Sequence, residues 1–347
     1  MSVDAARKSA CATDSKSCVT VVVATLAGGD ALADCLRSLE KQTIDRYEVI
    51  VVDNSGTHQI QPWGQRTRVI SNDKNVGFGA AINQGIRASD APYVATLNDD
   101  AVADSRWLET LVNAAEARPD VGMCASEVRL AGTNTLDSAG MLIAIDGSSK
   151  QRGHGEPPEK YASAIDALCP SGSAALYRRT MLDQIGLFDE SFFLYCEDTD
   201  LGLRAQWAGW KCAYVPGAIV EHQYSRSAGR ASPMKAYFVE RNHWYLALKN
   251  FPWPLVMFVK QASFVRYFWH LVSLMEGRGK ASEFRGSGHS LVFLAFLMFR
   301  AWIAAIVRLP RLWSARRRII KKRRITRQEF RKILADHSTT LRKVAQL

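Results

Sequence analysis

The stretch "VTVVVATLAGGDALADCLRSLEKQ", residues 19–42, indicates the class of fold to expect. Its first six residues form a continuous apolar, largely β-branched run, which is typical of a parallel strand buried on both faces. The following residues place four apolar side chains at helical spacing between Leu32 and Leu39, with Asp30 as the expected N-cap. The stretch therefore predicts a buried strand followed directly by an amphipathic helix.

The same alternation continues along the chain. Further strand patterns cover residues 48–52, 68–71, 93–97 and 121–128, and helix patterns cover residues 79–89 and 106–119. This order favours a parallel α/β sheet with right-handed crossovers. No G-x-G-x-x-G follows the first strand and no G-x-x-x-x-G-K-[ST] is present. A dinucleotide-binding domain is therefore disfavoured, and a P-loop is excluded.

Polar residues follow three of these strands. Thr25 ends the first strand, Asp53 the second, and Asn98, Asp99 and Asp100 follow the strand at residues 93–97. In open α/β sheets, ligands bind beyond the carboxyl ends of the strands. Acidic side chains at such an edge suggest a divalent cation that bridges to a bound group.

A second acidic motif lies in "FLYCEDTDLGLR", residues 193–204, where three carboxylates occupy four positions. Like charges this close raise the cost of ionising one another. Helix N-termini favour one or two acids, and Asp200 and Arg204 at i,i+4 spacing are expected to form a structural pair. The pattern alone leaves the roles of Glu197 and Asp198 open.

Four motifs in order resemble glycosyltransferase family 2. They are "VTVVVATLAGGDALADCLRSLEKQ...YEVIVVDNSG", "NVGFGAAINQGI", "YVATLNDDA" and "FFLYCEDTDLGLRAQWAGWKCAYVPGAIVEH", and the resemblance covers roughly residues 19–250. It implies the GT-A type of α/β fold, with Rossmann-like βαβ units, and the use of nucleotide sugars with inversion. The chain is most similar to the rhamnosyltransferase-like enzymes of bacterial polysaccharide assembly, which share the N-x-G-F segment, the Asn-initiated acidic motif and an Arg-rich tail.

The resemblance also implies roles for individual residues. Contacts to the nucleotide sugar fall to Thr25, Asp53, Asn75, Gly77, Asn83, Asn98, Asp99 and Arg226. Asp100 and His222 are expected to hold a divalent cation, Mn²⁺ or Mg²⁺. Asp198 is expected to be the general base, with Glu197 positioning the acceptor and raising the pKa of Asp198. The segment 131–165 matches an insertion of the sub-group, and the sequence assigns it no function.

The net charge of +11 is concentrated near the C-terminus. Residues 308–324, "RLPRLWSARRRIIKKRR", hold nine basic residues and no acid. Such a run binds phosphate, either of nucleic acid or of anionic lipid. Upstream lie two apolar stretches, 251–275 and 291–307, and each is interrupted by one or two basic residues. Charges at that spacing favour helices lying in the membrane interface over clean spans.

Taken together, the patterns predict an N-terminal extension (1–18), a GT-A domain (19–250) and a helical, basic, membrane-associating region (251–347). The expected enzyme is a metal-dependent inverting hexosyltransferase. It would move rhamnose or a related hexose from a dTDP- or UDP-linked donor to a hydroxyl of a lipid-linked or polysaccharide acceptor. The positive charge favours peripheral binding at the cytoplasmic face of a bacterial inner membrane.

Two other classes of protein compete with this interpretation. A nucleic-acid-binding protein is disfavoured because the basic tail lacks interleaved stacking aromatics, zinc-ligand spacing and a helix-turn-helix pattern. A membrane scaffold with a non-catalytic transferase domain is disfavoured by the intact Asp53, Asp100, Asp198 and His222. For the tail itself, a soluble helical appendage and a membrane span at residues 291–307 stay open.

Overall fold

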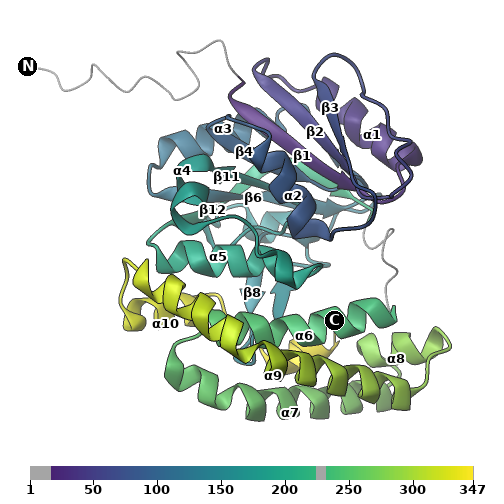
Figure 1. The fold of residues 1–347 in the computed structure, drawn as a ribbon, viewed down its shortest axis with the longest axis vertical. Helices are drawn as coiled ribbons and strands as arrows, with labels where there is room; N and C mark the ends of the chain where they lie inside the picture. Colours follow the sequence, from purple (N-terminus) through teal and green to yellow (C-terminus); the bar gives the residue numbers. More distant parts are fainter. Residues whose placement is uncertain (1–16, 224–231, 347) are drawn as a thin grey trace, which may run out of the picture.

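The computed structural model describes residues 17–223 and 232–346. It has two layers, an α/β layer above and a layer of helices below it (Figure 1). The first strands and helices are β1 Val19–Thr25, α1 Gly29–Glu40, β2 Tyr47–Asp53, β3 Thr67–Ser71, α2 Phe78–Arg87, β4 Tyr93–Leu97, β5 Ala101–Ala103, α3 Trp107–Ala117 and β6 Val121–Leu130. They are followed by β7 Leu136–Ser138, β8 Met141–Ile143, β9 Ser149–Gln151, β10 Asp166–Ala167, β11 Ala174–Arg178, α4 Arg179–Ile185, α5 Glu197–Trp207 and β12 Lys211–His222.

The main sheet has the strand order β10-β12-β6-β11-β4-β1-β2-β3. Strands β1 to β4 pair in parallel, as predicted, and so do β6 and β12. The predicted parallel arrangement does not extend to β11, which runs antiparallel to both β4 and β6, and β5, β7 and β10 also pair antiparallel with their neighbours. The chain leaves β6 and enters β11 at the same edge of the sheet. A parallel pair would need a crossover that carries the chain back to the opposite edge, and none lies between these two strands.

Two apolar cores lie on the two faces of this sheet. One contains the buried side of α1 and α3, and the other contains α2, α4 and α5. Alternate residues of β1 point to opposite cores, with Val21 and Val23 on one side and Val22 on the other. The predicted N-cap of the first helix is off by two residues: Gly28 is the N-cap, and Asp30 lies in the first turn.

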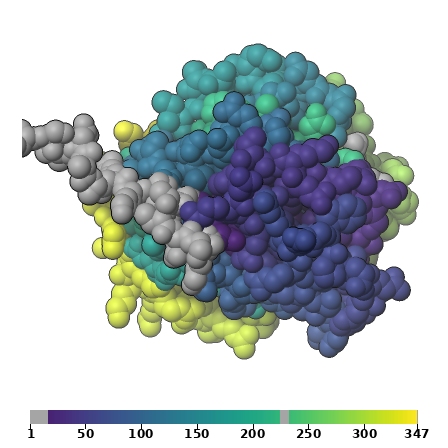
Figure 2. All heavy atoms as spheres, turned by 90° about the horizontal axis from the view of Figure 1, so that it is seen from above, coloured from purple at the N-terminus to yellow at the C-terminus, as the bar shows by residue number. Residues whose placement is uncertain are grey.

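The C-terminal region supplies the second layer. It consists of α6 Pro233–Asn250, α7 Trp253–Met275, α8 Gly279–Gly286, α9 Leu291–Lys321, α10 Arg327–Asp336 and α11 Leu341–Gln346. Helices α6 and α9 run in the same direction. Tyr245 Oη donates to the carbonyl of Ala304, and further along both helices Arg316 Nη1 donates to the carbonyl of Leu248. Seen from above, the N-terminal half of the chain, coloured purple to teal, covers most of the face, and the C-terminal helices show only at its rim (Figure 2).

Helix α9 is long and apolar enough to cross a membrane by length and composition, and only 17% of its most apolar 18-residue window is buried. Helix α7 likewise exposes large apolar side chains. Arg266, which interrupts the first apolar stretch of the sequence, does not face outward. It is 5% exposed, and it pairs with Asp146 at 2.6 Å and with Glu240 at 2.9 Å, so it ties α7 to the segment 131–165 and to α6.

Candidate active site

The carboxyl ends of β1, β2 and β4 bring Thr25, Asp53 and the segment Asn98–Asp100 to one edge of the sheet. Thr25 Oγ1 donates to Asp99 Oδ2 at 2.6 Å, which joins the ends of β1 and β4. Burial, then the neighbouring charge of Asp100, raises the pKa of Asp99, and the Thr25 hydroxyl opposes the shift. The predicted edge cluster therefore forms.

Asp53 is fully buried at the end of β2. Its Oδ1 accepts from the backbone N–H of Ser55 at 2.9 Å, whereas Oδ2 is buried without a hydrogen-bond partner. A buried carboxylate oxygen without a donor costs free energy, and native structures rarely leave one unpaired. This oxygen is therefore suited to accept an N–H from a bound group, such as the imide of a pyrimidine base.

His222, at the end of β12, reaches the acidic motif from the other half of the sheet. Its Nε2 lies 3.1 Å from Asp100 Oδ1 and 3.2 Å from Asn98 Nδ2. Burial disfavours the imidazolium, but hydrogen bonds and charge from Asp100 and Asp137 outweigh burial and raise the pKa of His222 to about 9. The resemblance assigned Asp100 and His222, more than a hundred residues apart, to one cation, and the structure brings the two side chains into contact.

Asp137 completes this group, although no pattern in the sequence predicts it. It lies on β7, in the segment 131–165, and is 1% exposed. Its Oδ2 lies 2.8 Å from His222 Nδ1, and its Oδ1 lies 3.1 Å from His154 Nδ1. A carboxylate on the second nitrogen of a histidine fixes the tautomer and the ring orientation that a metal ligand needs. No motif surrounds Asp137 in the sequence, and only its acidic side chain in a strand-like segment could have drawn attention.

Asp100 Oδ1 and His222 Nε2 lie close enough together to contact one divalent cation. Two ligand atoms at right angles around an ion and about 2.1 Å from it lie about 3.0 Å apart, close to the 3.1 Å between Asp100 Oδ1 and His222 Nε2. Within residues 17–223 and 232–346, no group of three or more His, Cys, Asp or Glu side chains could hold a metal ion. Mg²⁺ commonly takes one or two protein ligands and completes its shell with phosphate oxygens and water.

The second acidic motif forms the first turn of α5. Asp198 Oδ2 accepts from the backbone N–H of Gly172 at 2.9 Å, and its Oδ1 accepts from the backbone N–H of Thr199 at 2.6 Å. The adjacent carbonyl of Ser173 accepts the backbone N–H of Asn98 at 2.8 Å. The Gly172–Ser173 turn before β11 thus connects the Asp198 carboxylate directly to the Asn98–Asp100 motif.

Glu197 and Asp198 differ in burial. Glu197 is 5% exposed and its Oε2 is buried without a partner, whereas Asp198 is partly exposed. Burial, then the charge of Asp198, raises the pKa of Glu197 to about 8. Burial also raises the pKa of Asp198, opposed by its hydrogen bonds to Gly172 and Thr199. Of the two residues, Asp198 is the more exposed.

The structural pairing of Asp200 with Arg204 is confirmed. Arg204 Nε donates to Asp200 Oδ2 at 2.9 Å, and Asp200 is fully buried. Lys249 of α6 lies 2.8 Å from the other carboxylate oxygen of Asp200. The third acid of the motif therefore holds α5 in place and is not open to a ligand.

The N-terminus of α2 lies against the aromatic run before α5. Gly77 has φ +89°, and a Cβ there would meet the carbonyl oxygen of Phe193 at 2.4 Å, so only glycine fits. Asn75 is exposed and accepts the backbone N–H of Gly77. Asn83 is buried, with its amide bonded to Phe188 and Glu190, so the structure does not bring it to the strand-end cluster. The remaining candidate, Arg226, lies outside the described residues.

Comparisons with known proteins agree with this geometry. The family described as "Glycosyl transferase family 2" matches residues 20–186. A curated relative from Mycobacterium tuberculosis, named "N-acetylglucosaminyl-diphospho-decaprenol L-rhamnosyltransferase", is 31% identical over 67% of this chain and 85% of its own length. An O-antigen chain rhamnosyltransferase of Salmonella typhimurium is 24% identical over 60% of this chain and 67% of its own.

Solved structures share the fold at low sequence identity. GalNAc-T7, crystallised with UDP, GalNAc and Mn²⁺, is 15% identical with a TM-score of 0.55, covering 69% of this chain and 49% of that one. Residues 1–349 of S. aureus TarS are 16% identical with a TM-score of 0.51, covering 90% and 91%. These likenesses support the GT-A type of α/β fold. The sequence match over two thirds of the chain and the strand-end geometry lead to one conclusion: this chain belongs to glycosyltransferase family 2, among its rhamnosyltransferase-like members.

Proposed function

We propose that the protein transfers rhamnose, with inversion, from a dTDP- or UDP-linked donor to a hydroxyl of a lipid-linked acceptor, and that it needs a divalent cation. The observation that carries the proposal is the Gly172–Ser173 turn, which connects the Asp198 carboxylate to the Asn98–Asp100 motif. A relative of 31% identity is named as a rhamnosyltransferase acting on a decaprenol-linked diphospho-sugar, which supports this choice of donor sugar and acceptor.

The donor would lie along the carboxyl edge of the sheet. The unpaired Oδ2 of Asp53 would accept the imide N–H of the base, and the Thr25–Asp99 pair would face the ribose. Asp100 and His222 would hold the cation, which, when bound, neutralises charge on the diphosphate. Asp137 would keep His222 oriented through the hydrogen bond to Nδ1.

Asp198 would act as the general base in a single displacement. It takes the proton from the acceptor hydroxyl while that oxygen forms a bond to the anomeric carbon and the nucleoside diphosphate leaves from the opposite face. Hydrogen bonds from Gly172 and Thr199 hold the carboxylate in one orientation. Glu197 is more buried than Asp198, so we assign it to positioning Asp198 within the first turn of α5.

The C-terminal helices would hold the enzyme on the cytoplasmic face of the membrane. Contacts of α6 with α9 at Tyr245–Ala304 and Leu248–Arg316 support a helix that lies along the protein and does not leave it to span the bilayer. We keep the division into 1–18, 19–250 and 251–347. Helix α6, at the end of the second part, packs on the third and connects the two.

The test is sugar transfer by the variant Asp198→Asn, with Asp183→Asn, an exposed acid on α4, as the matched control. Transfer from dTDP-rhamnose to a diphospho-sugar lipid should fall by about 10²–10⁴-fold in Asp198→Asn, the range for a lost general base. Nucleotide affinity should stay within twofold. Transfer near the unmodified rate would contradict the base assignment, and transfer from other nucleotide sugars alone would contradict the donor.

A further inference from the structure

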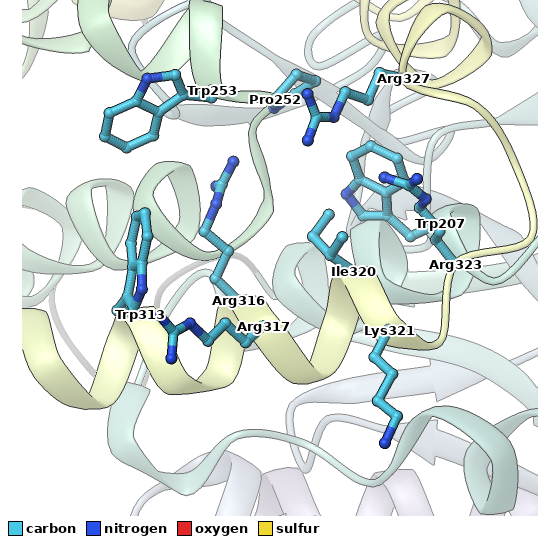
Figure 3. A pocket seen from close by; sticks show the side chains of 10 residues that line it. All are labelled: Trp207, Pro252, Trp253, Trp313, Arg316, Arg317, Ile320, Lys321, Arg323 and Arg327. Carbon is cyan, nitrogen blue, oxygen red and sulfur yellow. The ribbon is translucent and has the colours of Figure 1, made fainter.

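A cavity of about 820 Å³ opens where α7 begins and α9 ends, away from the active site (Figure 3). Its lining includes three tryptophans and four arginines, namely Trp207, Trp253, Trp313, Arg316, Arg317, Arg323 and Arg327. Arg316 and Arg327 point into the same space from α9 and from the start of α10 (Figure 3). The cavity thus combines aromatic rings with an unusual density of positive charge.

No acid offsets this charge within the described part of the chain. Residues 308–328 contain no Asp or Glu. None of the four arginines forms an ion pair with a described carboxylate, and the nearest acid in sequence, Glu329, is bonded to Thr326 in a capping box. Guanidinium groups that share a cavity without a counter-charge repel one another, and an anion bound between them would remove that cost.

Arg316 makes the strongest case for an anion. It is 8% exposed, and among the described residues its guanidinium donates only to the carbonyl of Leu248, at 3.1 Å. Burial, then the positive charge of Arg327, lowers its pKa. A buried cation without a paired anion is costly in a folded protein. A ligand with phosphate oxygens would supply the missing partner and match the planar donors of arginine.

Trp253 and Trp313 indicate what kind of anion fits the cavity. Exposed apolar residues form one stripe on α7 (Trp253, Met257, Phe264, Phe268, Leu271 and Met275) and one on α9 (Val292, Phe296, Phe299, Ile303, Ile306 and Trp313). Spacings of three, four or seven residues put the members of each stripe on one helix face. Trp253 begins the first stripe and Trp313 ends the second, with ring centroids 5.6 Å apart.

Tryptophan prefers the boundary between the apolar interior and the polar surface of a membrane. The arginines of the cavity follow Trp313 by one helical turn and more. Apolar surface, an aromatic boundary and cations therefore succeed one another in the order of the acyl chains, glycerol and phosphate of a phospholipid. This order argues for an amphiphilic anion over a water-soluble one.

We propose that this cavity binds the phosphate headgroup of one anionic phospholipid, with the acyl chains lying on the apolar stripes of α7 and α9. The proposal rests on the membrane association put forward above. The phosphate would not be that of the acceptor, because α5 separates Asp198 from Trp207 at the cavity by nine residues, about 14 Å along the helix. A sugar joined directly to its diphosphate does not bridge that distance. The bound lipid would instead fix how the enzyme sits on the bilayer.

The experiment compares two double variants of the full-length protein that lose the same charge from the same region. Arg316→Gln with Arg327→Gln removes charge from the cavity, and Arg311→Gln with Arg318→Gln removes charge from exposed positions of α9 outside it. Lipid retention is read by native mass spectrometry after incubation with phosphatidylglycerol in detergent. The unmodified protein and the control should retain one phosphatidylglycerol, and the cavity variant should retain at least tenfold less.

Vesicle flotation with rising phosphatidylglycerol content provides the second measurement. Each basic residue near an anionic surface contributes about 1 kcal/mol without any specific site, so equal losses of affinity and retention in both double variants would overturn the proposal. The single variant Arg327→Gln guards against the case in which Arg316→Gln disturbs folding, because Arg327 is exposed. It should also lose phosphatidylglycerol retention. Displacement of the lipid by millimolar inorganic phosphate would overturn it in favour of a free-phosphate site. Failure of the unmodified protein to float on any vesicle would overturn membrane association itself.

Discussion

The buried pair Asp200–Arg204 allows the structural and chemical parts of the acidic motif to be separated by one substitution, Arg204→Met. Arg204 is 8% exposed, and its guanidinium donates to Asp200 at 2.9 Å. It also donates to the backbone carbonyls of residues 185, 186 and 187 at 3.0, 3.0 and 2.7 Å. Methionine keeps much of the volume of the side chain but donates none of these hydrogen bonds.

The expected loss of unfolding free energy in Arg204→Met follows from the polar groups that would lose their donor. Breaking a buried ion pair by removing one partner typically costs about 3–5 kcal/mol. Three carbonyls would also lose a donor, at about 1–3 kcal/mol each if nothing replaced it. Asp200 would still hold Lys249 at 2.8 Å and Asn250 at 2.9 Å, and water can reach part of the turn. We therefore expect the free energy of unfolding to fall by about 3–5 kcal/mol and not by the full sum.

Urea unfolding followed by tryptophan fluorescence measures this loss. Arg87→Met is the matched control, because the exposed Arg87–Glu190 pair should contribute less than about 1 kcal/mol. Below the unfolding transition, Arg204→Met should bind nucleotide and transfer sugar at near the unmodified rate per folded molecule. Unchanged stability, or lost turnover at unchanged stability, would refute the structural assignment of this pair.

Further predictions concern the strand-end cluster and the first turn of α5. Asp100→Ala should weaken the binding of Mn²⁺ with a nucleoside diphosphate in calorimetry more than His222→Ala does, because a carboxylate is the better ligand for a hard cation; full transfer activity in excess EDTA would contradict both. Asp137→Asn should lower Mn²⁺ affinity by about 10–100-fold, since it acts only by orienting His222, and an unchanged calorimetric affinity would remove Asp137 from the site. Burial and Asp198 raise the pKa of Glu197 from 4.5 to about 8, so the folded state binds more protons than the unfolded state in that range, and stability falls as pH rises through it. Glu197→Gln should remove up to about 4 kcal/mol of this dependence between pH 5 and pH 8, and urea unfolding with the same pH slope in the variant as in the unmodified protein would count against the raised pKa.

Part of the fold and of the candidate site follows from sequence alone. Apolar runs and helical spacing predicted β1, α1 and β2, because burial of one face or of both sets the periodicity of these elements locally. Parallel strands end at a common edge, so the polar residues after them were predicted to meet, and the Thr25–Asp99 hydrogen bond confirms that they do. The Asp200–Arg204 pair is a contact within one helix, and i,i+4 spacing was enough to predict it.

Features that depend on contacts between residues distant in sequence were decided by the tertiary structure. Strand β11 looks like any other apolar strand, and only its entry at the edge of the sheet where β6 ends makes it antiparallel. Asp137 meets His222 across 85 residues, from a segment without a recognisable motif. Arg266 interrupts an apolar stretch in the sequence, yet it is buried because Asp146 and Glu240 converge on it from two other elements. Local periodicity indicates which face of its own helix or strand a residue occupies. The partner of a buried charge depends instead on how the whole chain packs.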